Sequence, residues 1–155
     1  MDRLHFIQQH IDEQIEKLHN PNLKKLAYLH TYGVFQLASL LAIKRNINIE
    51  HAKICALLHD ISQYSENASR KEHAKRSSIY AQKLLTSSSL FEKDEIQKIC
   101  DAILTHSDKA TRNDSELGEL LKDADLLQHY LFDPANVIEK NAQFRLYYVL
   151  EEIKK

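Results

Sequence analysis

Glycine and proline are scarce in this chain: its 155 residues include two of each, and tryptophan does not occur. Ordinary proteins contain about 7% glycine and about 5% proline. Strand-rich folds need many tight turns, which depend on these residues, so the scarcity argues against such a fold. Two glycines are also too few for a glycine-rich loop that wraps a phosphate group.

Cysteine is also scarce, since Cys55 and Cys100 are the only two in the sequence. They form neither a CxxC pair nor any other short spacing typical of zinc ligands. Both lie on apolar helical stripes. We interpret them as small buried thiols in a reducing compartment.

A strong charge of one sign is missing, because 21 Lys and Arg stand against 22 Asp and Glu. Nucleic-acid binders usually carry a marked basic surface, so we expect no nucleic-acid polymer as a partner. The N-terminus lacks an apolar core of signal-peptide length, and the longest apolar run, Val34 to Ile43, is too short to span a bilayer. We therefore expect a cytoplasmic protein with no membrane partner, and its oligomeric state stays open.

Apolar residues recur every three or four positions along most of the chain, which is the pattern of amphipathic helices. We predict an all-α bundle of six or seven helices that forms a single domain over residues 1–155. Ser62 to Arg70 is polar and aperiodic and is predicted to be a loop. Asn113, Asp114 and Ser115 are alternative N-caps for the sixth helix. The predicted helices are Asp2–His19, Asn22–Arg45, Ile49 to Asp60 or Ile61, Lys71–Ser87, Lys93–Thr105, Glu116–Tyr130 and a last helix from Pro134 to the C-terminus.

Histidine is abundant, with nine residues, and its placement is informative. His30 replaces an apolar residue on the stripe that includes Leu26 and Val34, so it points inward. His59 and Asp60 are adjacent at the end of the apolar segment KICALLHDIS. An ionised carboxylate is costly to bury unless a cation or strong donors accompany it, and a metal ion would supply that cation.

Three further residues fit the same description. His73 lies in the first turn of the fourth predicted helix, His106 lies at the end of the fifth, and Asp125 lies inside an apolar stretch of the sixth. Each residue alone is more often a hydrogen-bonded core or helix-end group than a metal ligand. Together with His30, His59 and Asp60 they occupy inward or end positions of five predicted helices, which favours one shared site.

In this order the residues resemble the HD-domain family of metal-dependent phosphohydrolases. The signature of that family is a histidine, a His-Asp pair and a distal aspartate, which match His30, His59-Asp60 and Asp125. His73 and His106 are similar to the additional histidines of the dinuclear branch. The resemblance extends from about Leu26 to Tyr130 and implies a helical bundle around a buried metal site.

The resemblance also separates matching residues from similar ones nearby. The segment LKDADL offers Asp123 as well as Asp125, and the family places the ligand after alanine, which selects Asp125. Asp123 is then a residue behind the ligands or on the surface. The other histidines have no counterpart, and we interpret them as solvated or packing residues: His5, His10, His19, His51 and His129.

By resemblance, one ion would bind His30, His59, Asp60 and Asp125, and Asp60 would bridge to a second ion held by His73 and His106. Mixed imidazole and carboxylate ligands favour Fe, Mn, Co or Ni over Zn or Mg. Two ions would activate a bridging hydroxide as nucleophile and stabilise the leaving oxygen of an in-line displacement. Asp60, the bridging ligand, is the predicted catalytic residue.

The resemblance implies hydrolysis of a phosphoester or phosphoanhydride in a small substrate, which we expect to be nucleotide-like. Lys109 and Arg112 beside His106, Arg76 after His73, and Lys122 before Asp125 are candidate contacts for phosphate oxygens. The alternative for these four is solvated surface charge. We expect the segments Ser62 to Arg70 and Ser107 to Asp114 to form the rim that selects the base or sugar.

Two alternatives share the same six ligands. Some HD-type proteins use a mixed-valence di-iron pair to activate oxygen, and a non-catalytic domain would bind a ligand through a retained metal site. The order of the ligands does not separate these functions. Metal analysis, oxygen uptake and phosphate release do separate them.

Overall fold

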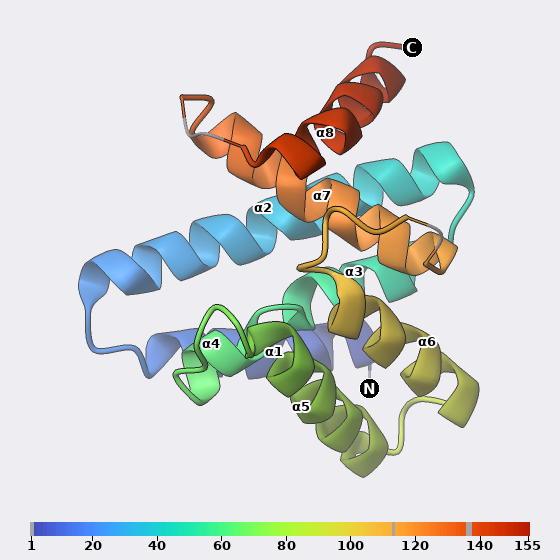
Figure 1. Ribbon diagram of the computed structural model, residues 1–155. Helices are drawn as coiled ribbons and strands as arrows, with labels where there is room; N and C mark the ends of the chain where they lie inside the picture. Colours follow the sequence, from blue (N-terminus) through green and yellow to red (C-terminus); the bar gives the residue numbers. More distant parts are fainter. Residues whose placement is uncertain (1, 113, 136–137) are drawn as a thin grey trace.

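The structure is a computed structural model that describes residues 2–112, 114–135 and 138–155. Within these ranges the chain forms eight α-helices and no strand, which confirms the predicted all-α class. Figure 1 shows them as a bundle in which α8 lies on the outside next to α7. The helices are α1 (Arg3–Glu16), α2 (Pro21–Arg45), α3 (Ile49–Leu58), α4 (Ile61–Ser65), α5 (His73–Ser88), α6 (Lys93–Thr105), α7 (Glu116–Phe132) and α8 (Lys140–Ile153).

Local sequence signals define several helix ends. The side chain of Asn20 accepts hydrogen bonds from the amides of Asn22 and Leu23, with Pro21 at the first helical position of α2. At α7, the hydroxyl of Ser115 accepts from the amide of Gly118, so Ser115 is the cap among the three predicted alternatives. Asn113 lies outside the described residues.

The segment predicted as a loop after Ile61 begins with a short helix, α4 (Ile61–Ser65). Its polar residues are packed against α5: the Ser62 amide donates to Ser77 Oγ at 3.1 Å, and the Ser62 hydroxyl donates to the His73 carbonyl at 3.0 Å. Ser62 is fully buried. The prediction of an unstructured segment from its first residue is therefore wrong, because contacts with another helix order a polar sequence.

The last helix begins at Lys140 rather than at Pro134. Pro134 and Ala135 lie in a turn, and the Ala135 amide donates to the side chain of Asp133 at 3.2 Å. Such a local bond between an aspartate side chain and the backbone competes with helix formation. Residues 136–137, which the prediction also included, lie outside the described residues.

The core lies where α2, α3 and α7 pack together, with α1 against α3 and α5 against α6. Most of α3 is buried, including Ile54, Leu57 and Leu58, because it is covered on several sides. Cys55 and Cys100 are buried free thiols, as predicted, and burial raises the pKa of both. This packing brings the ends of α3, α5 and α6 toward the middle of α2 and α7.

Helix α2 is long and apolar enough to span a membrane, with 25 residues and a mean hydropathy of 1.4 in its most apolar window. The apolar run from Val34 to Ile43 did not indicate a segment of that length. However, α2 packs along α3 and α7 as a central element of the bundle. A long core helix has the same composition, and we assign α2 to the bundle.

One ion-pair network joins α1 to α3 and α6. Arg3 lies 2.6 Å from Glu50 and 2.8 Å from Glu95, and Glu95 also lies 3.0 Å from His51. Hydrogen bonding to Arg3 lowers the pKa of Glu95 to about 2. The network thus joins helices that are far apart in the sequence.

We expect this network to stabilise the fold in a pH-dependent way. A lowered folded-state pKa means that the contribution of Glu95 is complete above its ordinary value of 4.5 and is lost as the pH falls toward about 2. Glu95→Gln should therefore lower the free energy of unfolding at neutral pH and flatten its acid dependence in that window. Urea unfolding at several pH values measures the free energy of unfolding. If this free energy depends on pH equally in the variant and the wild type, the lowered pKa assigned to Glu95 is contradicted.

Candidate metal centre

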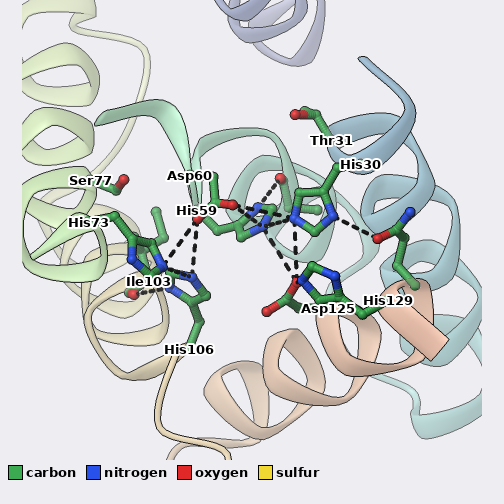
Figure 2. A network of polar contacts seen from close by, with 12 residues as sticks. His30, Thr31, His59, Asp60, His73, Ser77, Ile103, His106, Asp125 and His129 are labelled. Carbon is green, nitrogen blue, oxygen red and sulfur yellow. Dashed lines mark hydrogen bonds and ion pairs between the residues drawn. The ribbon is translucent and has the colours of Figure 1, made fainter. Parts of the chain in front are cut away.

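The six residues singled out in the sequence lie together in the structure (Figure 2). Asp60, His59, His73, His106 and Asp125 are at most 9% exposed, and the His30 side chain is 15% exposed. They come from five places: the middle of α2, the junction of α3 and α4, the start of α5, the end of α6 and the middle of α7. We call these six residues the His/Asp cluster.

One half of the cluster is centred on His30 and His59. Their Nε2 atoms are 3.0 Å apart. Asp60 Oδ2 lies 3.3 Å from the first Nε2 and 3.5 Å from the second. Asp125 Oδ1 lies 3.4 Å and 3.9 Å from the same two atoms.

The other half is centred on His73 and His106, whose Nε2 atoms are 3.1 Å apart. Here the other carboxylate oxygen of Asp60, Oδ1, lies 3.3 Å from His73 Nε2 and 3.4 Å from His106 Nε2. Asp60 therefore faces each half of the cluster with a different oxygen.

The second ring nitrogen of each histidine fixes its orientation. The Nδ1 atoms of His59, His73 and His106 each donate, at 2.7 Å, to the carbonyl three residues earlier in the chain. His30 Nδ1 donates to Gln128 Oε1 at 2.7 Å. A neutral imidazole with its proton on Nδ1 has a lone pair on Nε2, so all four rings direct a metal-binding atom into the cluster.

The buried carboxylates of the cluster are suited to bind a cation. In the part of the chain that the structure describes, Asp60 Oδ1 and Asp125 Oδ1 are the buried side-chain atoms without a hydrogen bond. Burial opposes protonation of His59 and lowers its pKa to about 4. Burial also acts on His30, but its hydrogen bond to Asp60 and the charges of Asp125 and Asp60 raise its pKa to about 9.

The donor set fits divalent metal ions. Close groups of His and Asp ligand atoms occur twice, as His30, His59 and Asp125 and as His59, Asp60 and His106. In each histidine pair, two Nε2 lone pairs face each other about 3 Å apart. These lone pairs and the carboxylate oxygens without a hydrogen bond destabilise the folded protein unless a cation lies between them. A cation between them would satisfy both, and imidazole with carboxylate suits Fe, Mn, Co and Ni.

Gly33 on α2 allows one of these orientations. A Cβ atom added at this position would lie 2.9 Å from Cγ of Gln128, the residue that accepts from His30 Nδ1. The side chain of Gln128 therefore packs directly over the glycine backbone. Groups that bind the far nitrogen of a metal-ligating histidine tune its affinity for the metal.

We expect Gly33→Ala to weaken metal binding while preserving the fold. The new methyl group displaces Gln128, and loss of such a partner typically costs about 10–100-fold in metal affinity. Alanine in a helix interior stabilises the helix by about 1 kcal/mol relative to glycine, so thermal stability without metal should not fall sharply. Metal titration tests this, with Gln128→Ala as the matched variant. Full metal affinity in Gly33→Ala would show that Gln128 does not position His30.

The structure places the four predicted phosphate contacts in different surroundings. Lys109 lies at the cluster, with Nζ 2.5 Å from both Asp125 Oδ2 and the His106 carbonyl oxygen. Arg76 is exposed and pairs with Glu66 at 2.9 Å. These two stay predictions as substrate contacts.

The structure gives the other two cations partners away from the cluster. Lys122 is fully buried and binds Asp114, Glu119 and the Thr111 carbonyl, so its ammonium group is not available to a substrate. The guanidinium of Arg112 lies 4.0 Å from the ring centre of Phe144 on α8. Helical spacing relative to Asp125 and His106 did not reveal these partners, because they belong to other segments.

Two residues that the sequence analysis did not select lie at the cluster. Gln128 binds His30, and His129 Nε2 lies 3.3 Å from Asp125 Oδ1, with its ring 4.7 Å from that of His30. The spacing of four residues between Asp125 and His129 was a usable signal. Asp123 is buried and pairs with Arg45 and Arg145, so it lies behind the ligands rather than on the surface.

A small hollow opens beside the cluster. It has a volume of about 160 Å³ and shares His30 and His129 with the site. Most of its lining is apolar, and Leu26, Leu29 and Phe132 remain partly exposed around it. The full lining consists of Leu26, Leu29, His30, Gln128, His129 and Phe132.

Comparison with known proteins identifies this arrangement. The family model of the HD domain matches residues 27–129, which contain the whole His/Asp cluster. No curated protein matches the chain. A crystal structure of a predicted HD superfamily hydrolase from an uncultured Thermotogales bacterium is similar, with 25% identity and a TM-score of 0.65 over 97% of this chain and 88% of that one. At the level of the family these findings support a metal-dependent phosphohydrolase, and the chain belongs to the HD domain family.

Proposed function

We propose that this HD domain protein uses two divalent ions to hydrolyse a phosphoester or phosphoanhydride of a small, nucleotide-like substrate. The observation that carries the proposal is the position of Asp60 between the two histidine pairs, with one oxygen facing each pair. A carboxylate so placed is suited to bridge two ions. Asp125 faces only the His30 and His59 pair, which supports an unequal division of ligands between the ions.

The six cluster residues would bind the two ions in unequal numbers. His30, His59, Asp60 and Asp125 would hold one ion, and His73, His106 and Asp60 the other. Bound ions of this kind supply positive charge to phosphoryl oxygens and an activated water as nucleophile.

Lys109 has three N–H groups, and two of them are used by Asp125 and the His106 carbonyl. The third would donate to a phosphate oxygen.

The apolar hollow beside His30 supports a substrate with a flat apolar group. Phe132, Leu26 and Leu29 offer contact area, while His30 and His129 connect the hollow to the cluster. Pockets for small molecules typically combine apolar walls with a few placed polar groups. A nucleobase is one such group, and its phosphate would then lie over the ions. This position differs from the rim expected from residues 62–70 and 107–114.

Phosphate release tests the proposal. The protein would be purified without chelator, analysed for metals, and incubated with Mn²⁺, Co²⁺ or Fe²⁺ and a panel of nucleoside mono-, di- and triphosphates, with phosphoserine as a substrate that lacks a base. Metal-dependent release that favours nucleotides supports the proposal. Oxygen uptake without phosphate release would indicate the di-iron oxygenase instead, and ligand binding without either would indicate a non-catalytic domain.

A further inference from the structure

The last helix contacts the segment that carries Lys109, although the helix lies outside the matched family region. The family match ends at residue 129, whereas α8 spans Lys140–Ile153. Arg145 on α8 is 4% exposed, so its guanidinium is buried inside the protein. Its partners include the segment that carries Lys109.

Arg145 binds the backbone on both sides of position 110. Its Nε donates to the Lys109 carbonyl at 3.1 Å, and its Nη2 donates to the Thr111 carbonyl at 2.9 Å. The Thr111 carbonyl is shared with Lys122 at 3.0 Å. On its other side, Arg145 Nη1 lies 2.8 Å from both Asp123 and Glu119 on α7. The planar fork of arginine thus clamps the segment onto α7.

The clamped segment sets the position of an ammonium group at the cluster. Lys109 follows His106 by three residues, and its Nζ contacts Asp125 Oδ2 and the His106 carbonyl. The backbone at Lys109 is not in a helix. Its conformation is therefore not fixed by a helical ladder, and the bonds from Arg145 add to the local bonds that Asp108 makes to Ala110 and Thr111.

We propose that Arg145 is a positioning residue, which holds residues 107–112 so that the Lys109 ammonium stays over the cluster and binds a phosphate oxygen of the substrate. The binding of phosphate rests on the proposed function, whereas the clamping of the segment does not. Through Arg145, α8 supports the active site of this chain.

A matched arginine separates positioning from general stability. Arg45 at the end of α2 also pairs with Asp123, at 2.7 Å, and with Glu152 on α8, at 2.6 Å. The structure gives Arg45 no hydrogen bond to residues 107–112 within the described ranges. Arg145→Lys and Arg45→Lys both keep a positive charge near Asp123, but lysine cannot reach two carbonyls and two carboxylates together.

Hydrogen exchange in the full-length chain tests the clamp directly. Loss of hydrogen bonds from a charged donor should increase amide exchange in residues 107–112 by about tenfold or more in Arg145→Lys. Arg45→Lys should leave this segment unchanged. Equal exchange in the two variants would overturn the proposal, whatever reaction the protein catalyses.

A double-mutant cycle tests whether Arg145 acts through Lys109. In the Mn²⁺-loaded protein, Lys109→Ala should raise the Kd of inorganic phosphate about tenfold or more, because a charged donor is lost. Arg145→Lys should raise it several-fold alone and add nothing in the Lys109→Ala background. If Arg145→Lys raises the Kd of phosphate by the same factor in the Lys109→Ala background as in the wild type, the proposal is overturned. If the wild-type protein binds no phosphate, the proposed function fails, and the exchange experiment still decides the clamp.

Discussion

Replacement of Asp60 by alanine is expected to abolish turnover and to lower the metal content more than loss of any other single ligand. Asp60 faces both histidine pairs, so its removal would open a coordination position on each of the two proposed ions. Loss of several kcal/mol of transition-state stabilisation corresponds to a decrease of at least about 10³-fold in kcat. His73→Ala should instead remove mainly one ion, because this residue contacts only one oxygen of Asp60.

Metal analysis by mass spectrometry and steady-state kinetics measure both effects. Asp101→Ala on the exposed face of α6 is the matched control and should keep full metal content. Asp60→Asn keeps the size of the side chain and should fail like Asp60→Ala, with helical content unchanged by circular dichroism. Equal metal loss in Asp60→Ala and His73→Ala would contradict the bridging assignment.

Removal of the metal ions is the second change with a large expected effect. An ion that binds only the folded state stabilises it by about 2.7 kcal/mol when its concentration is 100 times Kd. For a chain of this length that corresponds to a decrease in Tm of about 5–10 °C on chelation. Turnover should fall to background at the same time, because in the proposed reaction the nucleophile is a water molecule that the ions would activate.

Calorimetry with and without chelator checks this expectation, and added Mn²⁺ should restore both Tm and activity. The Asp60→Ala variant serves as the control, since its Tm should respond weakly to Mn²⁺. A wild-type protein with the same Tm in chelator and in excess Mn²⁺ would show that the His/Asp cluster binds no ion in the folded state.

Local patterns made the helices predictable. The three- and four-residue periodicity, the Asn20-Pro21 pair and Asp133 gave α1, α2 and α7 within a few residues of their ends. Tertiary contacts decided the exceptions: Ser62 is helical because α5 orders it, and α8 starts at Lys140 after a turn at Asp133. A sequence pattern contains no information on such partners.

The convergence of the His/Asp cluster was predictable for a similar reason. Periodicity shows which side of a helix faces the core, and helix ends are visible as breaks in the pattern, so inward polar residues on five helices indicate a common site. The resemblance to the HD domain then indicated which of Asp123 and Asp125 belongs to it. The structure places Asp125 in the cluster and Asp123 against Arg45 and Arg145.

By itself the sequence determined the all-α class and the six polar residues that meet in the core. Only the tertiary structure showed that Gln128 binds His30, that Lys122 is buried beside Asp114 and Glu119, and that Arg145 binds the Lys109 carbonyl. Hydrogen bonds act over about 3 Å, whereas periodicity specifies only the inward face of a helix. Which groups from other helices come within that distance depends on how the helices pack.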